Sequence, residues 1–109
     1  MGDGLGQGDL EAALAAYRRA AAKDPNSAFL HLALSQAAVR LDGHFEEALE
    51  HALIAQRLDP ADDQTRVYVG SLYRLQGNLA EAEKYLVRED KTPFSVDAAL
   101  LLGPMYLEA

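Results

Sequence analysis

The feature that most constrains the fold of this chain is a regular spacing of helix-breaking residues. The dipeptide Asp-Pro occurs twice, 35 residues apart, and another proline follows after 33 more, at Asp24-Pro25, Asp59-Pro60 and Pro93. Glycine turns alternate with the prolines at intervals of 35 and 34 residues, at Gly8, Gly43 and Gly77. Such a period indicates a repeat protein, in which each unit buries its apolar face by stacking on its neighbours.

Between the breakers, apolar residues recur every third or fourth position, which predicts helices. Leu10, Ala13 and Tyr17 follow the first glycine with this spacing, and the segments after Gly43 and Gly77 repeat it. Three further helices are expected after the prolines, over roughly 28–41, 63–76 and 95–107. The sequence therefore predicts an all-α chain of six helices, in which short turns make successive helices antiparallel.

Capping residues mark the ends of these helices. Ser27 and Ser95 are expected to accept amide hydrogen bonds at helix starts. Asn78 begins a segment that resembles a capping box. Gly43 and Gly77 suit the left-handed residue that ends a helix, so the expected boundaries agree with the repeat spacing.

Composition excludes several classes of function. The 109 residues carry a formal net charge of −7, which argues against nucleic-acid binding and against anionic membrane surfaces. The absence of cysteine excludes disulfides and thiolate metal sites. No stretch is long and apolar enough to insert directly into a membrane, and the N-terminus lacks the pattern of a signal peptide. The compartment stays unassigned, with the cytoplasm favoured.

The segment that starts at Asp63 carries the clearest sequence motif of the chain. Val69-Gly70 and Tyr73 lie in its first helix, and Ala82 with Leu86 lies in its second. With these residues the chain resembles the tetratricopeptide repeat, a helix-turn-helix unit of about 34 residues with the pattern Trp-x2-Leu-Gly-x2-Tyr, then Ala-x3-Phe, then Pro.

The resemblance covers nearly the whole chain, as a single domain over residues 1–109. Its parts are a half repeat at 8–27 (a second helix), full repeats at 28–62 and 63–94, and a half repeat at 95–109 (a first helix). It implies antiparallel helix pairs stacked as a right-handed superhelix. Small residues at Ser35, Gly70 and Gly103 would let paired helices approach closely. His31 and Arg66 replace the family's Trp, and Pro93 comes one residue early, so an irregular end is expected for the third unit.

In this family the first helices of successive units line a concave groove that binds a peptide or helix of a partner protein. The residues at the corresponding positions are Phe29, Leu32, Gln36, Val39, Arg40, Gln64, Val67, Tyr68, Ser71, Arg74 and Leu100. The implied groove is mostly apolar with two arginines, which suits an apolar strand or an amphipathic helix that carries an acidic residue. The alternative is that several of these side chains simply belong to the core.

Chaperone-binding members of the family hold a C-terminal carboxylate with a Lys/Asn/Arg clamp. The corresponding positions of this chain are Leu32, Gln36, Tyr68, Asp97 and Leu101, so the clamp is missing and chaperone-tail binding is disfavoured.

No residue pattern indicates catalysis, a metal site or a cofactor. His31 and His51 fall on different expected helices without a second ligand at metal-binding spacing, and His44 falls in a turn. They are interpreted as surface or packing residues. The acidic residues Glu46, Glu47 and Glu50 are interpreted as a solvated face near a helix start, with an acidic docking surface as the alternative.

The last expected helix raises a separate hypothesis. Pro104 removes a helix hydrogen bond, so this helix is expected to kink or break near Leu102. Its apolar residues would be left uncovered, and Leu101, Met105 and Tyr106 are the candidates for a self-association end. The half repeat at one end of a copy would then receive the half repeat of another, giving a homo-oligomer.

Three functions from different classes remain open on the sequence. The first is a non-catalytic scaffold or adaptor that binds a protein segment in its groove. The second is a substrate-docking repeat region of a larger enzyme, such as a glycosyltransferase. The third is a self-assembly module. A catalytic domain in the full-length gene would favour the second.

Overall fold

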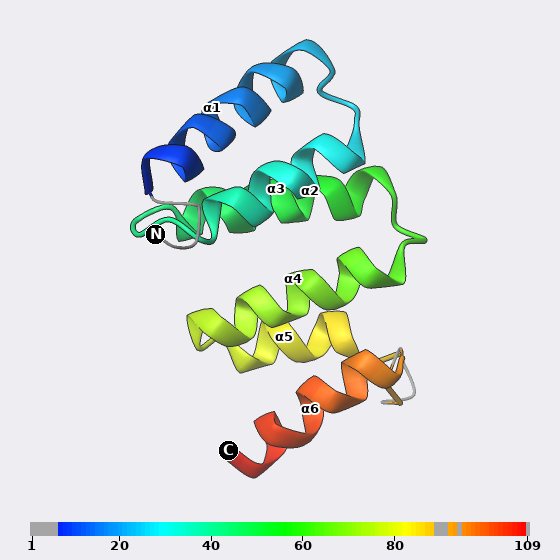
Figure 1. Ribbon diagram of the computed structural model, residues 1–109. Coiled ribbons are helices and arrows are strands. Elements are labelled where there is room, and N and C mark those ends of the chain that lie inside the picture. Colours follow the sequence, from blue (N-terminus) through cyan, green and yellow to red (C-terminus); the bar gives the residue numbers. More distant parts are fainter. Residues whose placement is uncertain (1–6, 89–91, 94, 109) are drawn as a thin grey trace. The chain divides into compact units, whose positions relative to one another are not determined.

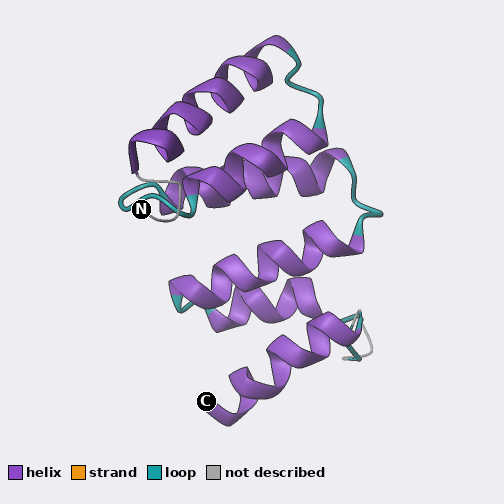
Figure 2. Cartoon of the chain, viewed as in Figure 1, coloured by secondary structure: helices purple, strands orange, loops and turns teal. Residues whose placement is uncertain are grey.

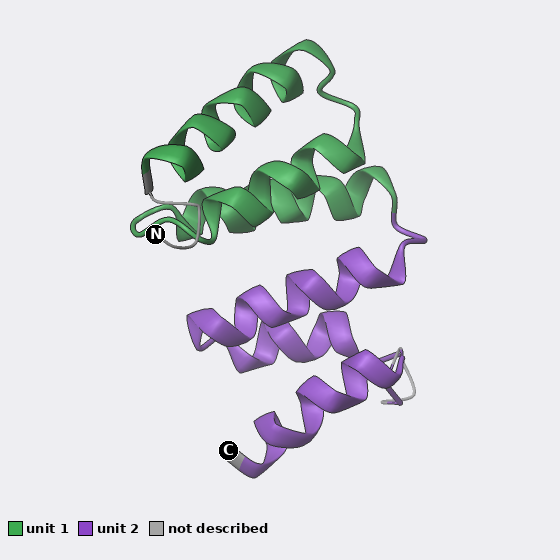
Figure 3. Ribbon diagram, in the orientation of Figure 1, with its two compact units in different colours: residues 1–59 green, residues 60–109 purple. Residues whose placement is uncertain are grey.

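The computed structural model describes residues 7–88, 92–93 and 95–108, and every regular element in these ranges is a helix (Figures 1 and 2). In chain order the helices are α1 (Gln7–Lys23), α2 (Ala28–Ala38), α3 (Phe45–Leu58), α4 (Asp63–Gln76), α5 (Leu79–Leu86) and α6 (Val96–Glu108). The all-α prediction of six helices is therefore confirmed. The chain divides into two compact units, residues 1–59 and 60–109, each with three of the helices (Figure 3).

The predicted N-caps are present. Ser27 accepts a hydrogen bond from the Leu30 amide, and the Asn78 side chain accepts one from the Glu81 amide. Ser95 accepts from the Ala98 amide in the same way. These bonds satisfy amides that have no partner in the first turn of a helix, which fixes where α2, α5 and α6 begin.

The predicted glycine ends are confirmed only in part. Gly77 ends α4 in the left-handed conformation, with φ of +89°. Gly43 also has a positive φ of +83°, but α2 has already ended at Ala38. The amides of Arg40 and Leu41 donate to carbonyls three residues earlier in the chain. The α-helix therefore ends in a tighter turn before it reaches the glycine.

Unit 1 is built from α1, α2 and α3, with α2 packed against both other helices. Its core contains Leu14, Ala21, Leu34, Ala37, Ala38, Leu41 and Ala48. Ser35 is fully buried, and its hydroxyl donates to the Ala48 carbonyl across the α2–α3 contact at 2.6 Å. The small side chains at both positions allow this close approach, as the sequence predicts.

Unit 2 is built from α4, α5 and α6. Its core contains Ala82, Leu86, Val87, Ala98, Leu102 and Met105. At Gly70 the helices α4 and α5 lie close together, because a Cβ atom placed there would lie 2.6 Å from Leu86 Cδ2. After α5 the chain makes an isolated antiparallel bridge between Val87 and Pro93, as expected for an irregular end. Residues 89–91 of that connection lie outside the described ranges.

Two expectations for the last helix are wrong, namely the break near Leu102 and the uncovered position of Met105. α6 continues through Pro104 to Glu108, and it does not break near Leu102. Only four residues of α6 follow the proline, so few helical bonds depend on that turn. Leu102 and Met105 are each 3% exposed and belong to the unit 2 core, so they are not part of an uncovered end. Gly103 has open space where a Cβ would lie, so no described helix approaches it closely.

Candidate functional site

A concave site in unit 1 lies between α1 and α2 and has a volume of about 260 Å³. We call it the α1–α2 pocket, and it is lined by Leu10, Ala13, Tyr17, Ala33, Gln36, Ala37 and Arg40. On each helix these residues recur every three or four positions, so each helix contributes one face. Three of the seven are alanines, whose short side chains leave the space open.

The amide and the guanidinium of the α1–α2 pocket come from α2 and the turn after it. Gln36 and Arg40 are both exposed to solvent. Arg40 forms no ion pair with any residue in the described ranges. The pocket therefore combines an apolar floor with an amide and a cation whose hydrogen-bonding capacity is directed to solvent.

The other predicted groove residues of unit 1 differ in how far they are exposed to solvent. Phe29 is 76% exposed, which is high for an aromatic side chain and favours a contact role. Leu32 is half-buried. Val39 packs against the unit 1 core, so it serves the fold at least in part.

The predicted groove residues of α4 belong to unit 2 and are described separately from those of α2. Gln64 is exposed, whereas Tyr68 and Arg74 are half-buried. Val67 packs against the unit 2 core. The Ser71 hydroxyl donates to the Tyr68 carbonyl at 2.7 Å, so it is used within its own helix.

The predicted residues of α6 divide by face. Leu100 is 67% exposed and Tyr106 is 55% exposed. Leu101 is half-buried against the unit 2 core. The Tyr106 hydroxyl donates to a carboxylate oxygen of Glu83 on α5 at 2.7 Å, which raises the pKa of the tyrosine. Of the three self-association candidates, Met105 is thus buried, Leu101 is half-buried and Tyr106 is exposed.

A charged network joins α1 to α3 within unit 1. Arg18 donates two hydrogen bonds to the Glu47 carboxylate, at 2.6 and 2.7 Å, and His44 Nδ1 lies 3.3 Å from the same carboxylate. The bond from Arg18 is the main cause that lowers the pKa of Glu47 to about 2. This pair could not be predicted from the sequence, because its two residues lie 29 positions apart.

The structure brings together two histidines that the sequence analysis had treated as separate. His31 Nδ1 lies 2.9 Å from His51 Nδ1, and their rings are nearly parallel, at 15°. His31 Nε2 lies 2.8 Å from the Pro25 carbonyl oxygen. His31 lies one turn before Ser35 and His51 about one turn after Ala48, so the antiparallel α2–α3 contact could have revealed this pairing.

The protonation of the histidine pair follows from its partners. The Pro25 carbonyl can only accept, so His31 Nε2 donates, and a single proton occupies the bond between the two Nδ1 atoms. A doubly charged pair would place two N–H groups against each other. Burial is the main cause that lowers the pKa of His51, followed by repulsion from His31. An apolar cavity of about 310 Å³ adjoins the pair, lined by Arg18, Ala21, Ala22, His31, Leu34 and His51.

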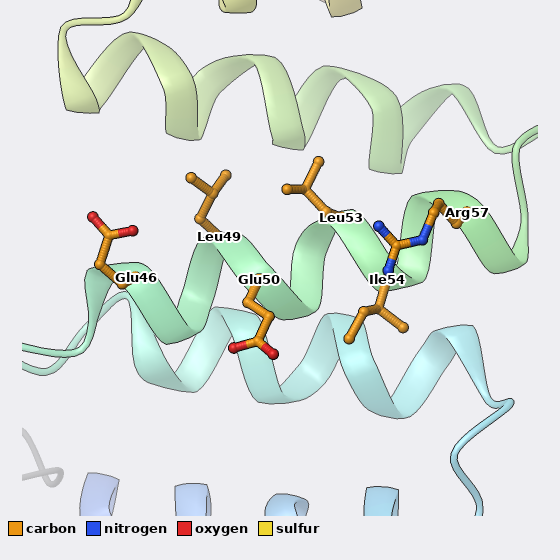
Figure 4. A pocket seen from close by; sticks show the side chains of 6 residues that line it. All are labelled: Glu46, Leu49, Glu50, Leu53, Ile54 and Arg57. Atoms are coloured by element: carbon orange, nitrogen blue, oxygen red, sulfur yellow. The ribbon is translucent and has the colours of Figure 1, made fainter.

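One face of α3 lines a further open pocket of about 320 Å³ (Figure 4). Its residues are Glu46, Leu49, Glu50, Leu53, Ile54 and Arg57. Figure 4 shows Leu49 and Leu53 pointing to one side of the helix and Glu50 pointing to the other. The acidic residues interpreted as a solvated face thus border an apolar strip, and the apolar strip was not anticipated.

The part of the chain that the structure describes contains neither a metal-binding cluster nor a membrane-spanning helix. No group of three or more histidine, aspartate or glutamate side chains is placed to hold a metal ion. No described helix has the length and apolar character needed to cross a bilayer.

Comparison with known proteins leaves the family open. No protein-family model matches the chain, and no curated protein sequence matches it either. Its class is therefore given by the structure alone, as an all-helical protein with two three-helix units.

Proposed function

We propose that this chain is a tetratricopeptide-type repeat module that binds a helix or an extended segment of a partner protein and performs no chemistry itself. The observation that carries the proposal is the α1–α2 pocket, which has an apolar floor with Gln36 and Arg40 exposed at its edge. Both residues are at positions that line the partner groove in the family that the sequence resembles.

The two close helix contacts support the repeat assignment. Ser35 meets Ala48 in the α2–α3 pair, and Gly70 meets Leu86 in the α4–α5 pair. Ser35 and Gly70 lie 35 residues apart, one repeat period. A small residue of the first helix therefore lies against the second helix at the same repeat position in both pairs, which is typical of a shared repeat unit.

The chemistry of the pocket indicates what it would bind. An amphipathic segment would place apolar side chains over Ala13, Ala33 and Ala37, and an acidic group beside Arg40. A carboxylate can accept two parallel bonds from a guanidinium, which fixes the register of the segment. Because the chain as a whole is acidic, with a net charge of −7, a ligand carboxylate would gain nothing from general attraction and would depend on this arginine.

The proposal is tested by selecting peptides from a random display library on the full chain and measuring their affinity by fluorescence anisotropy. The selected peptides are expected to share apolar residues next to Asp or Glu. Gln36→Ala/Arg40→Ala should weaken their binding about tenfold or more, since a charge-assisted hydrogen bond contributes about 1.5–3 kcal/mol.

Arg19→Ala is the matched control, because Arg19 is an exposed arginine of α1 that does not line the pocket. It should leave affinity unchanged. Peptides that bind the double variant as tightly as the parent, or a library that yields no binder, would count against the proposal.

A further inference from the structure

The exposed face of α6 is an apolar stripe. Val96 is 77% exposed, Leu100 67% and Leu107 88%. With Gly103 they fall at spacings of three and four residues, so all four lie on one face of the helix. Apolar side chains gathered in this way on a surface mark a contact site. We call this set the α6 stripe.

The chain itself shows how such a face is covered. Gly70 of α4 corresponds to Gly103 of α6, 33 residues later. Gly70 is covered by α5, whose Leu86 occupies the space that a Cβ would need and whose Ala82 is fully buried. The matching space over Gly103 is open. A helix that carries alanine and a larger apolar residue four positions later would therefore fit over Gly103 of α6, as α5 fits over Gly70.

α1 presents that spacing in an accessible form. Ala13 and Tyr17 repeat the separation of Ala82 and Leu86, and both line the α1–α2 pocket. Ala13 is only half-buried, whereas its counterpart Ala82 is 0% exposed. Within the described residues, no helix covers the floor of the pocket as α4 covers the corresponding residues of α5.

The charges at the ends of the helices favour one orientation of α6 in the α1–α2 pocket. Short turns join α1 to α2 and α4 to α5, so each pair is antiparallel (Figure 1). If α6 lies on α1 as α4 lies on α5, it runs in the same direction as α2. Its negative C-terminal end then meets Arg40, and Asp97 in its first turn meets Lys23 in the last turn of α1.

We infer that the occupant of the α1–α2 pocket is α6 of a second copy of this chain, which associates head to tail. The inference rests on the proposed function, because it names the partner of the same pocket. The contact is heterologous, since each copy gives its α6 stripe and receives another at its α1–α2 pocket. Such contacts continue into a filament or close into a ring.

The test is sedimentation velocity of the full chain over a wide range of concentration. The wild-type mass should rise above the 11.8 kDa of one chain as concentration rises. Gly103→Gln should remain at the mass of one chain, because the new side chain fills the space that Ala13 and Tyr17 of the other copy would enter. A Cβ at this position has nothing within 4 Å apart from its chain neighbours and its own helix backbone, so circular dichroism should show the helices intact.

A second variant removes the receiving surface. Gln36→Glu/Arg40→Glu changes two exposed residues and places negative charge where the C-terminal end of α6 would lie. Alone it should also remain monomeric. Mixed in equal amounts with Gly103→Gln, it should give a complex of two chains and no larger species, since one intact surface remains on each partner. Gly8→Gln, at another helical glycine with open space, should associate as the wild type does.

The outcomes separate this inference from the proposed function. A wild type that stays monomeric up to millimolar protein, or oligomers that persist in Gly103→Gln, would overturn the head-to-tail contact. If display-selected peptides still bind and lose affinity in Gln36→Ala/Arg40→Ala, the peptide-binding function stands with a different partner. If no peptide binds and no oligomer forms, both fail.

Discussion

At the scale of single residues, two glycines in equivalent repeat positions have opposite surroundings. Gly70 is buried against Leu86, with a Cβ position 2.6 Å from Cδ2 and 2.7 Å from Cγ. Gly103 lies in α6, where a Cβ atom would point into open space. The same substitution is therefore expected to cost more stability at Gly70 than at Gly103.

Gly70→Ala should lower the free energy of unfolding by about 1–2 kcal/mol, because overpacking at a buried contact outweighs the helix propensity of alanine. Gly103→Ala should change it by less than about 1 kcal/mol, because the helix propensity of alanine is opposed by the contact of its Cβ with the ring of the following Pro104. Urea denaturation followed by circular dichroism measures both. Adding Leu86→Val should recover part of the loss at Gly70, and a loss that does not respond to it would contradict the packing explanation.

The histidine pair makes stability depend on pH. Burial lowers the pKa of His51 below its ordinary 6.5, so the unfolded chain takes up a proton more readily than the folded one. The stabilisation is therefore complete above pH 6.5 and is lost as pH falls through and below that value. His31, Glu47, Glu50 and Arg18 are the charged or titratable neighbours that act on His51.

His51→Gln should remove this dependence. The urea midpoint of the wild type should be lower at pH 5.5 than at pH 7.5. The midpoint of the variant should change less between these two pH values. His44→Gln, at a half-buried histidine outside the pair, is the control and should keep the wild-type slope around His51. Equal slopes in the wild type and in His51→Gln would show that the pKa of His51 is not lowered by folding.

At the scale of elements, helix ends were the most predictable feature. Ser27, Asn78 and Ser95 were recognised as caps because the bonds they form are local in sequence. The cap of α4 was not recognised, although Asp62 accepts from two backbone amides and from the Thr65 hydroxyl. The signal was present, since aspartate before a helix is a favoured N-cap.

The contact between α1 and α3 through Arg18 and Glu47 is a stabilising link between elements. Glu47→Gln should lower the free energy of unfolding by about 1 kcal/mol at neutral pH, a modest value because Arg18 is half-exposed and screened by solvent. The pKa of Glu47 is lowered from 4.5 to about 2, so the wild-type contribution is full above pH 4.5 and is lost as pH falls toward 2.

Denaturation at several pH values between 7 and 2 checks this expectation. The difference between wild type and Glu47→Gln should shrink through the interval from pH 4.5 to about 2. Glu46→Gln, at an exposed neighbour on α3, should match the wild type throughout. A constant difference over that interval would mean that the variant acts through packing and not through charge.

At the scale of the whole molecule, the two units have separate cores. Leu34 is 1% exposed and packs with other unit 1 residues, and Leu86 is 0% exposed and packs with unit 2 residues. Leu34→Ala and Leu86→Ala should each lower the free energy of unfolding by about 2–5 kcal/mol, because each leaves a cavity in a core.

Hydrogen exchange read by mass spectrometry should locate each loss. Leu34→Ala should speed exchange most in α1–α3, and Leu86→Ala most in α4–α6, since each residue contacts the core of one unit. Uniform acceleration along the chain in both variants would show instead that the units unfold as one.

The sequence by itself determined the helical class, the number of helices and most of their ends. These depend on 3.6-residue periodicity, caps and breakers, which are local properties of the chain. It also located the small residues at Ser35 and Gly70, because the repeat spacing marks equivalent positions. Its groove positions Gln36 and Arg40 border the α1–α2 pocket that the structure contains.

Only the tertiary structure decided which faces of the helices are covered. It buried Met105 and left Leu100 and Leu107 exposed on the same helix, and it joined His31 to His51 and Arg18 to Glu47. Periodicity shows that a helix has an apolar face, but an all-round apolar helix such as α6 has no single inward side to read. Which side becomes core depends on neighbours that packing brings together from distant parts of the chain.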